Sequence, residues 1–340
     1  MNERYNFSQS RDQIEKVELN KNELDTISRL GLTFDDLEKI ISGPEMAEGS
    51  YALIFELPVS NPTILAKVWK NPKDDAWRAD HENVALRLLN LHKFKEAPHN
   101  MGYLKSETIL FEEKIDGNLI DNFDKTAINQ LAETMSKIHS IELNAYGKPL
   151  TKRKKGTQKD CLEDELEKLH IKLGFLSEEN QLEILSLIKQ AIEKIKKEVN
   201  DNSESFYASD FTLIHFDLNR NNILRSNDNS KIIIIDWEQA SAGDSAMDIA
   251  KMFLKLNFNE EQKNDFLLEY EKNISKKDYY FEDRLDAYCP LVLVNSILWR
   301  IGVMKNIPEE SSSTNEKEFY NRVKDNLDQE TIQLKEFLKS

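Results

Sequence analysis

Two short apolar runs separated by a polar turn restrict the fold of this chain more than any other feature. The runs cover residues 223–224 and 232–235, and the segment between them, 226–230, consists of Ser, Asn and Asp. Such residues form turns, so a β-hairpin is predicted. Asn222 precedes the first strand and Asp236 follows the second. Both side chains should therefore lie at the same open end of the hairpin.

The side chains gathered at that end have a chemistry in common. An amide oxygen and a carboxylate held together suit Mg²⁺, which prefers oxygen ligands and shares its coordination with substrate phosphates. Asp217 stands five residues before Asn222, on the loop that enters the hairpin, where a carboxylate could accept a proton from an attacking hydroxyl. With His215 and Asp236, this is the H-x-D-x-x-x-x-N plus Asp arrangement that kinases use for phosphoryl transfer.

The region before the hairpin is predicted to form a small α+β lobe. Strand-like tracts at 51–57 and 63–69 flank a Pro-containing turn, and a helical pattern follows at 75–92. A further strand is expected at 108–111. A helix is expected near 21–41, and residues 1–20 are expected to be a flexible extension or an added helix on the small lobe.

The rest of the chain is mainly helical in pattern. Residues 178–199 carry apolar side chains at spacings of three and four, which is typical of a helix with one buried stripe. The other predicted helices in this part cover residues 127–141, 163–173, 257–273 and 283–303. The fold class is therefore α+β, with a small β-rich lobe followed by a larger helical lobe.

Composition excludes several classes of function. The formal net charge is −15, whereas nucleic-acid binding needs clustered Lys and Arg, and only the short run 152–155 is basic. The apolar stretch 290–304 is too short to span a bilayer, and Asn295 and Arg300 interrupt it. No signal peptide is evident, and two widely spaced cysteines are typical of a reducing compartment. A cytoplasmic protein with neither a nucleic-acid nor a membrane partner is expected.

Three motifs resemble those of the aminoglycoside phosphotransferase and choline kinase-like enzymes, which are relatives of protein kinases. The family motif H-G-D-x-x-x-x-N is present as His215-Phe216-Asp217 followed by Asn222, and I-D-[FW]-[ED] as residues 235–238. The G-D-x-x-x-D-[IL]-A tail is present at 243–250, in the Gly-Asp-Ser form of hygromycin-type phosphotransferases. The resemblance spans roughly residues 35–305 and is most specific at the catalytic motifs.

The resemblance implies roles for these residues. Asp217 would be the catalytic aspartate, and Asn222 and Asp236 would hold magnesium, with two ions expected. His215 and Asp248 would brace the catalytic loop through hydrogen bonds. The phosphoryl donor would be ATP or GTP, and no residue pattern distinguishes the two nucleotides.

The small lobe would then bind the nucleotide. Lys67 occupies the place of the phosphate-binding lysine on a kinase-like third strand, and Glu82 on the next helix is its expected ion-pair partner, with Asp80 as a competitor. The other predicted nucleotide contacts are Gly49 and Ser50 in the loop over the phosphates, and Glu112 and Lys114 in the hinge. The nucleotide-binding lobe, with a helical N-terminal extension, is expected to cover 1–113, and the catalytic and substrate-binding lobe 114–340.

The acceptor is predicted to be a small molecule, because no A-P-E segment follows the hairpin and Trp237-Glu238 replaces the Phe-Gly of D-F-G. Carboxylates in the helical lobe would suit a cationic aminoglycoside antibiotic, which implies a role in antibiotic resistance. The candidate substrate residues are Glu238, Asp244 and Glu269, with Glu260, Glu261, Asp265 and Glu271 nearby.

Other functions stay open at this point. Aromatic residues of the same lobe could cage a quaternary ammonium, as a choline-type kinase requires. These residues are Trp237, Tyr270, Tyr279, Tyr280, Phe281 and Trp299. Kinases of ethanolamine, homoserine or a sugar-like metabolite, and a non-catalytic kinase-fold binding protein, are the remaining alternatives.

Overall fold

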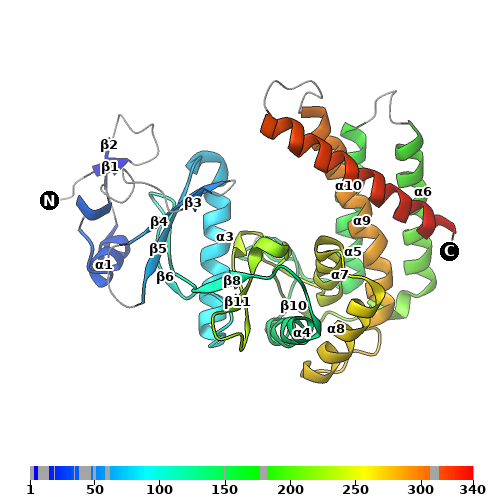
Figure 1. Cartoon of the computed structure of the whole chain (residues 1–340), viewed down its shortest axis with the longest axis horizontal. Helices are drawn as coiled ribbons and strands as arrows, with labels where there is room; N and C mark the ends of the chain where they lie inside the picture. Colours follow the sequence, from blue (N-terminus) through cyan, green and yellow to red (C-terminus); the bar gives the residue numbers. More distant parts are fainter. Residues whose placement is uncertain are drawn as a thin grey trace.

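The computed structural model shows a small lobe built on an antiparallel sheet and a larger, mainly helical lobe (Figure 1). This arrangement confirms the predicted α+β fold class. The residues that the structure describes are 4–6, 15–18, 20–33, 35–37, 47–48, 51–57, 62–148, 150–176, 182–306 and 314–339.

The small lobe contains a five-stranded sheet with the order β3-β4-β5-β7-β6, in which every neighbouring pair is antiparallel. Its strands are β3 (Ala47–Glu48), β4 (Ala52–Glu56), β5 (Ile64–Trp69), β6 (Asn100–Leu104) and β7 (Ile109–Glu113). The strands predicted at 51–57, 63–69 and 108–111 are thus confirmed. Strand β6 was missed because its Asn and Gly are poor strand formers.

Alternation along the strands separates the two faces of this sheet. On β5, Ala66 and Val68 are buried on one face, in a cluster that includes Ile27 of α1 (Lys21–Arg29). Lys67 projects from the other face, and on β7 Leu110, its cross-strand partner, and Glu112 alternate onto that same face. The sheet therefore carries an apolar core on one side and charged groups on the side of the second lobe.

The N-terminal segment differs in part from its prediction. Strands β1 (Arg4–Asn6) and β2 (Glu15–Glu18) pair antiparallel, so these residues do not form an added helix. The predicted helix begins at Lys21, where Asn20 and Glu23 form a capping box. The Glu23 carboxylate also accepts a hydrogen bond from the Ser106 N–H at 2.9 Å, which attaches the helix to the small lobe.

The long helix α3 (Pro72–Leu91) lies between the small sheet and the second lobe (Figure 1). Its proline stands in the first turn, where the missing N–H leaves no hydrogen bond unmade. Ala79, Leu86 and Leu89 are fully buried on its packed face. The helix packs against both the sheet and the turn η4 (Trp237–Gln239), so it links the lobes next to the predicted site.

The large lobe is a helical assembly around α9 (Phe281–Asn306), which packs against α5, α6, α7 and α10. By length and composition alone α9 could cross a membrane, but more than half of its apolar window is buried inside the lobe. The cytoplasmic location stays a prediction. The other helices are α4 (Lys125–His139), α5 (Gln158–Phe175), α6 (Leu182–Asp201), α7 (Ser245–Leu256), α8 (Glu260–Asn273) and α10 (Thr314–Lys339). Helices α7 and α10 were not predicted.

Two small sheets lie between these helices and the small lobe. One has the order β12-β11-β8, with β8 (Gly117–Leu119), β11 (Ile223–Ser226) and β12 (Ile232–Ile234); the other has the order β13-β10-β9, with β9 (Glu142–Leu143), β10 (Phe211–Ile214) and β13 (Ser241–Gly243). The pairing of Ile223 with Ile234 confirms the predicted hairpin. Gly117 allows β8 to approach it, because a Cβ there would lie 2.9 Å from the Arg225 carbonyl oxygen.

Candidate active site

The open end of the β11–β12 hairpin brings Asn222 and Asp236 together as expected. The Ile235 N–H donates to the Asn222 carbonyl at 3.0 Å, which closes the ladder just before both side chains. The Asn222 side-chain nitrogen donates to the Asp217 carbonyl at 2.9 Å. The side-chain oxygen of Asn222 accepts no hydrogen bond from the described residues, so it is available to a ligand at the end of the hairpin that also carries Asp236.

A buried carboxylate organises the loop between β10 and the hairpin. Asp248 on α7 accepts hydrogen bonds from the N–H groups of His215 at 2.9 Å and Phe216 at 2.8 Å. Phe216 has φ 64°, a left-handed conformation that costs a residue with a side chain about 1–2 kcal/mol. Burial opposes ionisation of Asp248, but hydrogen bonds from His139 and from the His215 N–H hold its pKa below the usual value. The charged carboxylate thereby stabilises the strained loop.

His215 connects this loop to the end of β12. Its Nε2 lies 3.0 Å from the Ile235 carbonyl oxygen, and its Nδ1 accepts the Asp217 N–H at 3.2 Å. Burial lowers the pKa of His215, so the ring is neutral and donates through Nε2. The imidazole thus fixes the backbone of Asp217, in keeping with the predicted bracing role.

Lys67 and Glu82 form the predicted ion pair, with 2.7 Å between Nζ and Oε2. Lys67 also lies 2.7 Å from Asp236 Oδ1, so a lysine of the small lobe reaches the hairpin of the large one. Burial alone would lower the pKa of Lys67, but the charges of Glu82 and Asp236 outweigh it and raise that pKa well above its usual value. Asp80 is not the partner, because it binds Tyr103 and Lys105 instead.

Of the remaining predicted nucleotide contacts, Glu112 lies near Lys67 and Lys114 does not. Glu112 is buried on the face of the sheet that carries Lys67, and its Oε2 has no hydrogen-bond partner among the described residues. An amino group of a nucleobase could supply that partner. Lys114 points elsewhere, because its Nζ pairs with Glu56 at 2.6 Å near the surface. Gly49 and Ser50 lie outside the described residues.

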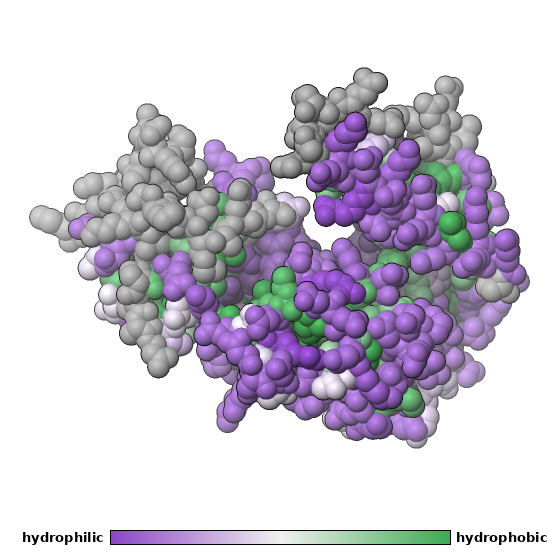
Figure 2. Space-filling model, in the orientation of Figure 1, coloured by the Kyte–Doolittle hydropathy of each residue, from purple (hydrophilic) through white to green (hydrophobic). Residues whose placement is uncertain are grey.

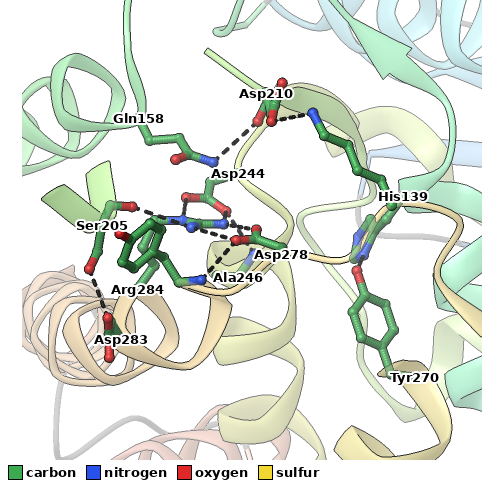
Figure 3. Close-up of polar contacts among 12 residues, drawn as sticks. His139, Gln158, Ser205, Asp210, Asp244, Ala246, Tyr270, Asp278, Asp283 and Arg284 are labelled. Carbon is green, nitrogen blue, oxygen red and sulfur yellow. Dashed lines mark hydrogen bonds and ion pairs between the residues drawn. The ribbon is translucent and has the colours of Figure 1, made fainter. Parts of the chain in front are cut away.

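Two of the three candidate substrate carboxylates are paired with cations of the protein. Asp244 is fully buried and lies 2.7 Å from Arg284 Nε, and Asp278 contacts the same guanidinium (Figure 3). Glu269 on α8 pairs with Lys272 at 2.8 Å. The structure therefore does not support substrate contacts for Asp244 and Glu269. Asp244 stands four residues before Asp248 in the tail motif, and this closeness in sequence made it a candidate for the site. In the structure, Arg284, forty residues later, encloses Asp244.

Glu238 lies closer to the catalytic loop but is also paired. Its Oε1 is 2.8 Å from Arg78 on α3, and the Arg78 guanidinium stacks 3.5 Å above the Tyr51 ring centroid. Burial raises the pKa of Glu238, and the Asp236 charge adds to the effect. A substrate contact from Glu238 would therefore compete with Arg78.

Sequence reasoning missed three lysines around Asp217. Lys255 lies 3.6 Å from Asp217 Oδ1, and the Lys251 ammonium lies 3.7 Å from the Phe216 ring centroid. The charge of Asp217 also acts on Lys148. The spacing of Lys251 and Lys255 from Asp248, three and seven residues along α7, was the signal that could have placed them on one helix face. Figure 2 shows a hollow between the lobes whose visible walls are largely hydrophilic.

A strand lysine paired with a helix glutamate, opposite an Asp and an Asn on one hairpin, defines a kinase-type phosphotransferase fold. The profile of the family described as choline/ethanolamine kinase matches residues 118–329. The chain belongs to this family, and it is a small-molecule phosphotransferase. The predicted resemblance is thereby confirmed.

Solved structures show the same fold. Choline kinase LicA from Streptococcus pneumoniae is 19% identical, with a TM-score of 0.56 over 84% of this chain and 92% of that chain. A Plasmodium vivax ethanolamine kinase is 16% identical, with a TM-score of 0.60 over 92% and 89%. Aminoglycoside phosphotransferase APH(4)-Ia is 15% identical, with a TM-score of 0.59 over 88% and 98%. A search of curated proteins found no match.

Proposed function

We propose that this chain transfers the γ-phosphoryl group of Mg·ATP or Mg·GTP to a hydroxyl of a small molecule, with Asp217 as general base. The observation that carries the proposal is the position of Lys67, 2.7 Å from both Glu82 and Asp236. That pair of contacts joins the two lobes at the point where the phosphates would lie.

The donor set fits magnesium and phosphate. The Asn222 side-chain oxygen and the Asp236 carboxylate are hard ligands, and Lys67 holds the pKa of Asp236 below its usual value although burial opposes this. Magnesium, when bound, would neutralise charge on the phosphate oxygens. Lys67 would contact phosphate oxygens while Glu82 holds its ammonium in place. The expected number of two ions stays a prediction.

Asp217 is placed to receive a proton. Its side chain is 31% exposed, and its backbone is fixed on both sides, by His215 at the N–H and by Asn222 at the carbonyl. A hydroxyl held against this carboxylate would lose its proton as the new P–O bond forms. His215 would be a positioning residue that fixes the Asp217 backbone and does not touch the substrate.

The acceptor is best supported as a small amino alcohol. The family description names choline and ethanolamine, and the aminoglycoside predicted from sequence is itself a polyamine with hydroxyl groups. The carboxylates expected to bind such a polyamine are paired within the protein: Glu238 with Arg78, Asp244 with Arg284, and Glu269 with Lys272. A smaller acceptor therefore takes first place, and an antibiotic-resistance role depends on the second candidate.

A coupled ADP- and GDP-release assay tests the proposal, with choline, ethanolamine, homoserine and aminoglycosides as acceptors. Acceptor-dependent release is expected, and Asp217→Asn should reduce it by about 10²- to 10⁴-fold while nucleotide binding persists. Asp201→Asn, on the exposed end of α6, is the matched control. Nucleotide binding without release on any acceptor would favour the non-catalytic alternative. Full turnover by Asp217→Asn would remove the base role.

A further inference from the structure

The lysines around Asp217 carry more positive charge than the neighbouring carboxylates balance. Asp217 itself is shared, because Lys255 lies 3.6 Å from its Oδ1. Asp248 is committed to the N–H groups of the catalytic loop, and Glu238 to Arg78. None of these groups can serve as a full counter-ion for a further lysine.

Lys251 is one of the lysines left over. It projects from α7 over the Phe216 ring at 3.7 Å, and no carboxylate of the described residues forms an ion pair with it. Burial lowers its pKa to about 8 and the Lys255 charge reinforces this shift, although the charges of Asp217, Asp248 and Glu165 oppose it. A largely desolvated ammonium that contacts an aromatic face and forms no ion pair within the described residues remains short of an anion.

Lys148 is the other, and it approaches from the segment between β9 and α5. Its ammonium donates to Gln239 Oε1 and lies 4.7 Å from the Trp77 ring centroid. Burial lowers its pKa to about 8, and the charges of Lys251 and Arg78 lower it further than Glu238 and Asp217 can restore. No carboxylate within the described chain pairs with it directly. Two under-compensated ammonium groups thus lie near one another beside Asp217.

We propose that the acceptor carries an anionic group, a carboxylate or a phosphate, which Lys251 and Lys148 bind while its hydroxyl faces Asp217. This rests on the proposed function, since it assigns the substrate class of the same site. Both lysines belong to the large lobe, whereas the predicted phosphate-binding lysine, Lys67, reaches Asp236 from the small lobe. The positive charges of Lys251 and Lys148 are therefore available to the acceptor and not to the nucleotide phosphates. An amino alcohol with a carboxylate, that is, a hydroxy amino acid, satisfies this requirement.

Matched acceptor pairs that differ only in the anionic group test the proposal. Homoserine is compared with 3-aminopropan-1-ol, serine with ethanolamine, and glucose 6-phosphate with glucose. One anionic member should have a kcat/KM at least about tenfold above that of its partner, because charge-assisted hydrogen bonds contribute effects of this size. Which pair shows the difference distinguishes a carboxylate from a phosphate.

Lysine variants identify the group responsible. Lys251→Met should raise the KM of the anionic acceptor by about 10- to 100-fold and should not raise the KM of the partner that lacks the anionic group. Lys251→Arg should restore most of the preference, because it keeps the charge. Lys196→Met, which removes an exposed lysine paired with Glu193 on α6, is the control and should change neither value.

The remaining outcomes also decide the matter. An equal fall in kcat for both members of a pair, with KM unchanged, would show that Lys251 acts on the transferred phosphoryl group and would overturn the proposal. Turnover of choline or ethanolamine with a kcat/KM above that of every anionic acceptor tested would overturn it while the proposed function stands. If no acceptor turns over, calorimetric titration of the same pairs into the protein with Mg²⁺ and a non-hydrolysable ATP analogue decides. Binding of an anionic member that is lost in Lys251→Met supports the proposal, and no such binding overturns it.

Discussion

Two ion-pair networks with buried cations look alike in composition. One joins Lys67 to Glu82 and Asp236, and the other joins Arg284 to Asp244 and Asp278. Each has one cation and two carboxylates, and each includes an aspartate at the end of a short strand. Both aspartates also stand in motifs of the same family resemblance.

The networks differ in what they leave open. The Asp236 side chain is 36% exposed, whereas Asp244 is fully buried and also caps α7 through the Ala246 N–H at 3.0 Å. Arg284 also donates a hydrogen bond to the Ser205 carbonyl, so its guanidinium binds groups of the protein (Figure 3). The two aspartates thus differ in exposure: a ligand can reach the Asp236 carboxylate, whereas Asp244 is enclosed by the protein.

The largest expected effect is a loss of turnover when the network of Lys67, Glu82 and Asp236, here called the open network, is broken. Asp236→Asn keeps the size of the side chain but removes the charge that pairs with Lys67 and that we propose binds Mg²⁺. Turnover should fall by about a thousandfold or more, because metal and electrostatic contributions to phosphoryl transfer are of this order. Rates measured across a magnesium titration, with circular dichroism to verify the fold, check this. A variant that retains near-normal turnover at ordinary magnesium would contradict the metal-binding role.

Substitutions in the network of Arg284, Asp244 and Asp278, here called the closed network, should change the stability of the fold and not the rate of catalysis. Arg284→Met leaves Asp244 as an uncompensated buried charge, which should lower the free energy of unfolding by about 3–5 kcal/mol. Urea unfolding measures the loss, and kcat per folded molecule should stay within a few-fold of the wild type. The double variant Arg284→Met/Asp244→Leu is the control, since removal of both charges should recover much of the stability. A selective rise in acceptor KM in Arg284→Met would instead return Asp244 to the substrate site.

The sequence was sufficient wherever the site is local in the chain. The hairpin that places Asn222 beside Asp236 follows from two apolar runs and a turn, and the Lys67–Glu82 pair follows from a strand and the next helix. These elements are close in sequence, so their geometry is set by β-pairing and by the helix repeat.

What could not be predicted depends on contacts between distant segments. Arg284 encloses Asp244 from 40 residues away, and the charge of Lys251 acts on Lys148 across 103 residues of sequence. The sequence shows many acidic residues in the large lobe and no sign that cations neutralise the nearest ones. The sequence could not show that the carboxylates predicted to bind a polyamine are paired within the protein, because net charge along the chain does not determine the charge at one point of the folded surface. We propose a lobe boundary at 113/114, because β7 ends at Glu113 and β8 joins the large lobe.

Lys251, next to Asp217, should contribute to function at a cost in stability that depends on pH. The pKa of Lys251 is about 8 in the folded protein, below its usual value, so below pH 8 the folded state carries a charge that it disfavours. Lys251→Met should therefore stabilise the fold at neutral pH, by at most about 3 kcal/mol. The gain should shrink as pH rises from 8, because the unfolded wild type keeps its proton up to a higher pH. Urea unfolding of the wild type and of Lys251→Met at pH 7 and near pH 10 measures the gain in stability and its decrease with pH. A variant less stable than the wild type at pH 7 would contradict the prediction.

The smallest effect is expected at an ion pair that belongs to neither network. Lys114 was predicted to contact the nucleotide, but its ammonium pairs with Glu56 where both side chains are solvent-accessible, at 30% and 42%. Its N–H is also used, by the Thr63 carbonyl at 2.8 Å. Because exposed pairs contribute little, Lys114→Ala should change the nucleotide KM by less than about twofold. Nucleotide titrations at saturating acceptor, compared with Glu56→Ala, measure this. A tenfold rise in Lys114→Ala alone would show that Lys114 leaves Glu56 to reach the nucleotide, and the ion pair would then belong only to the empty enzyme.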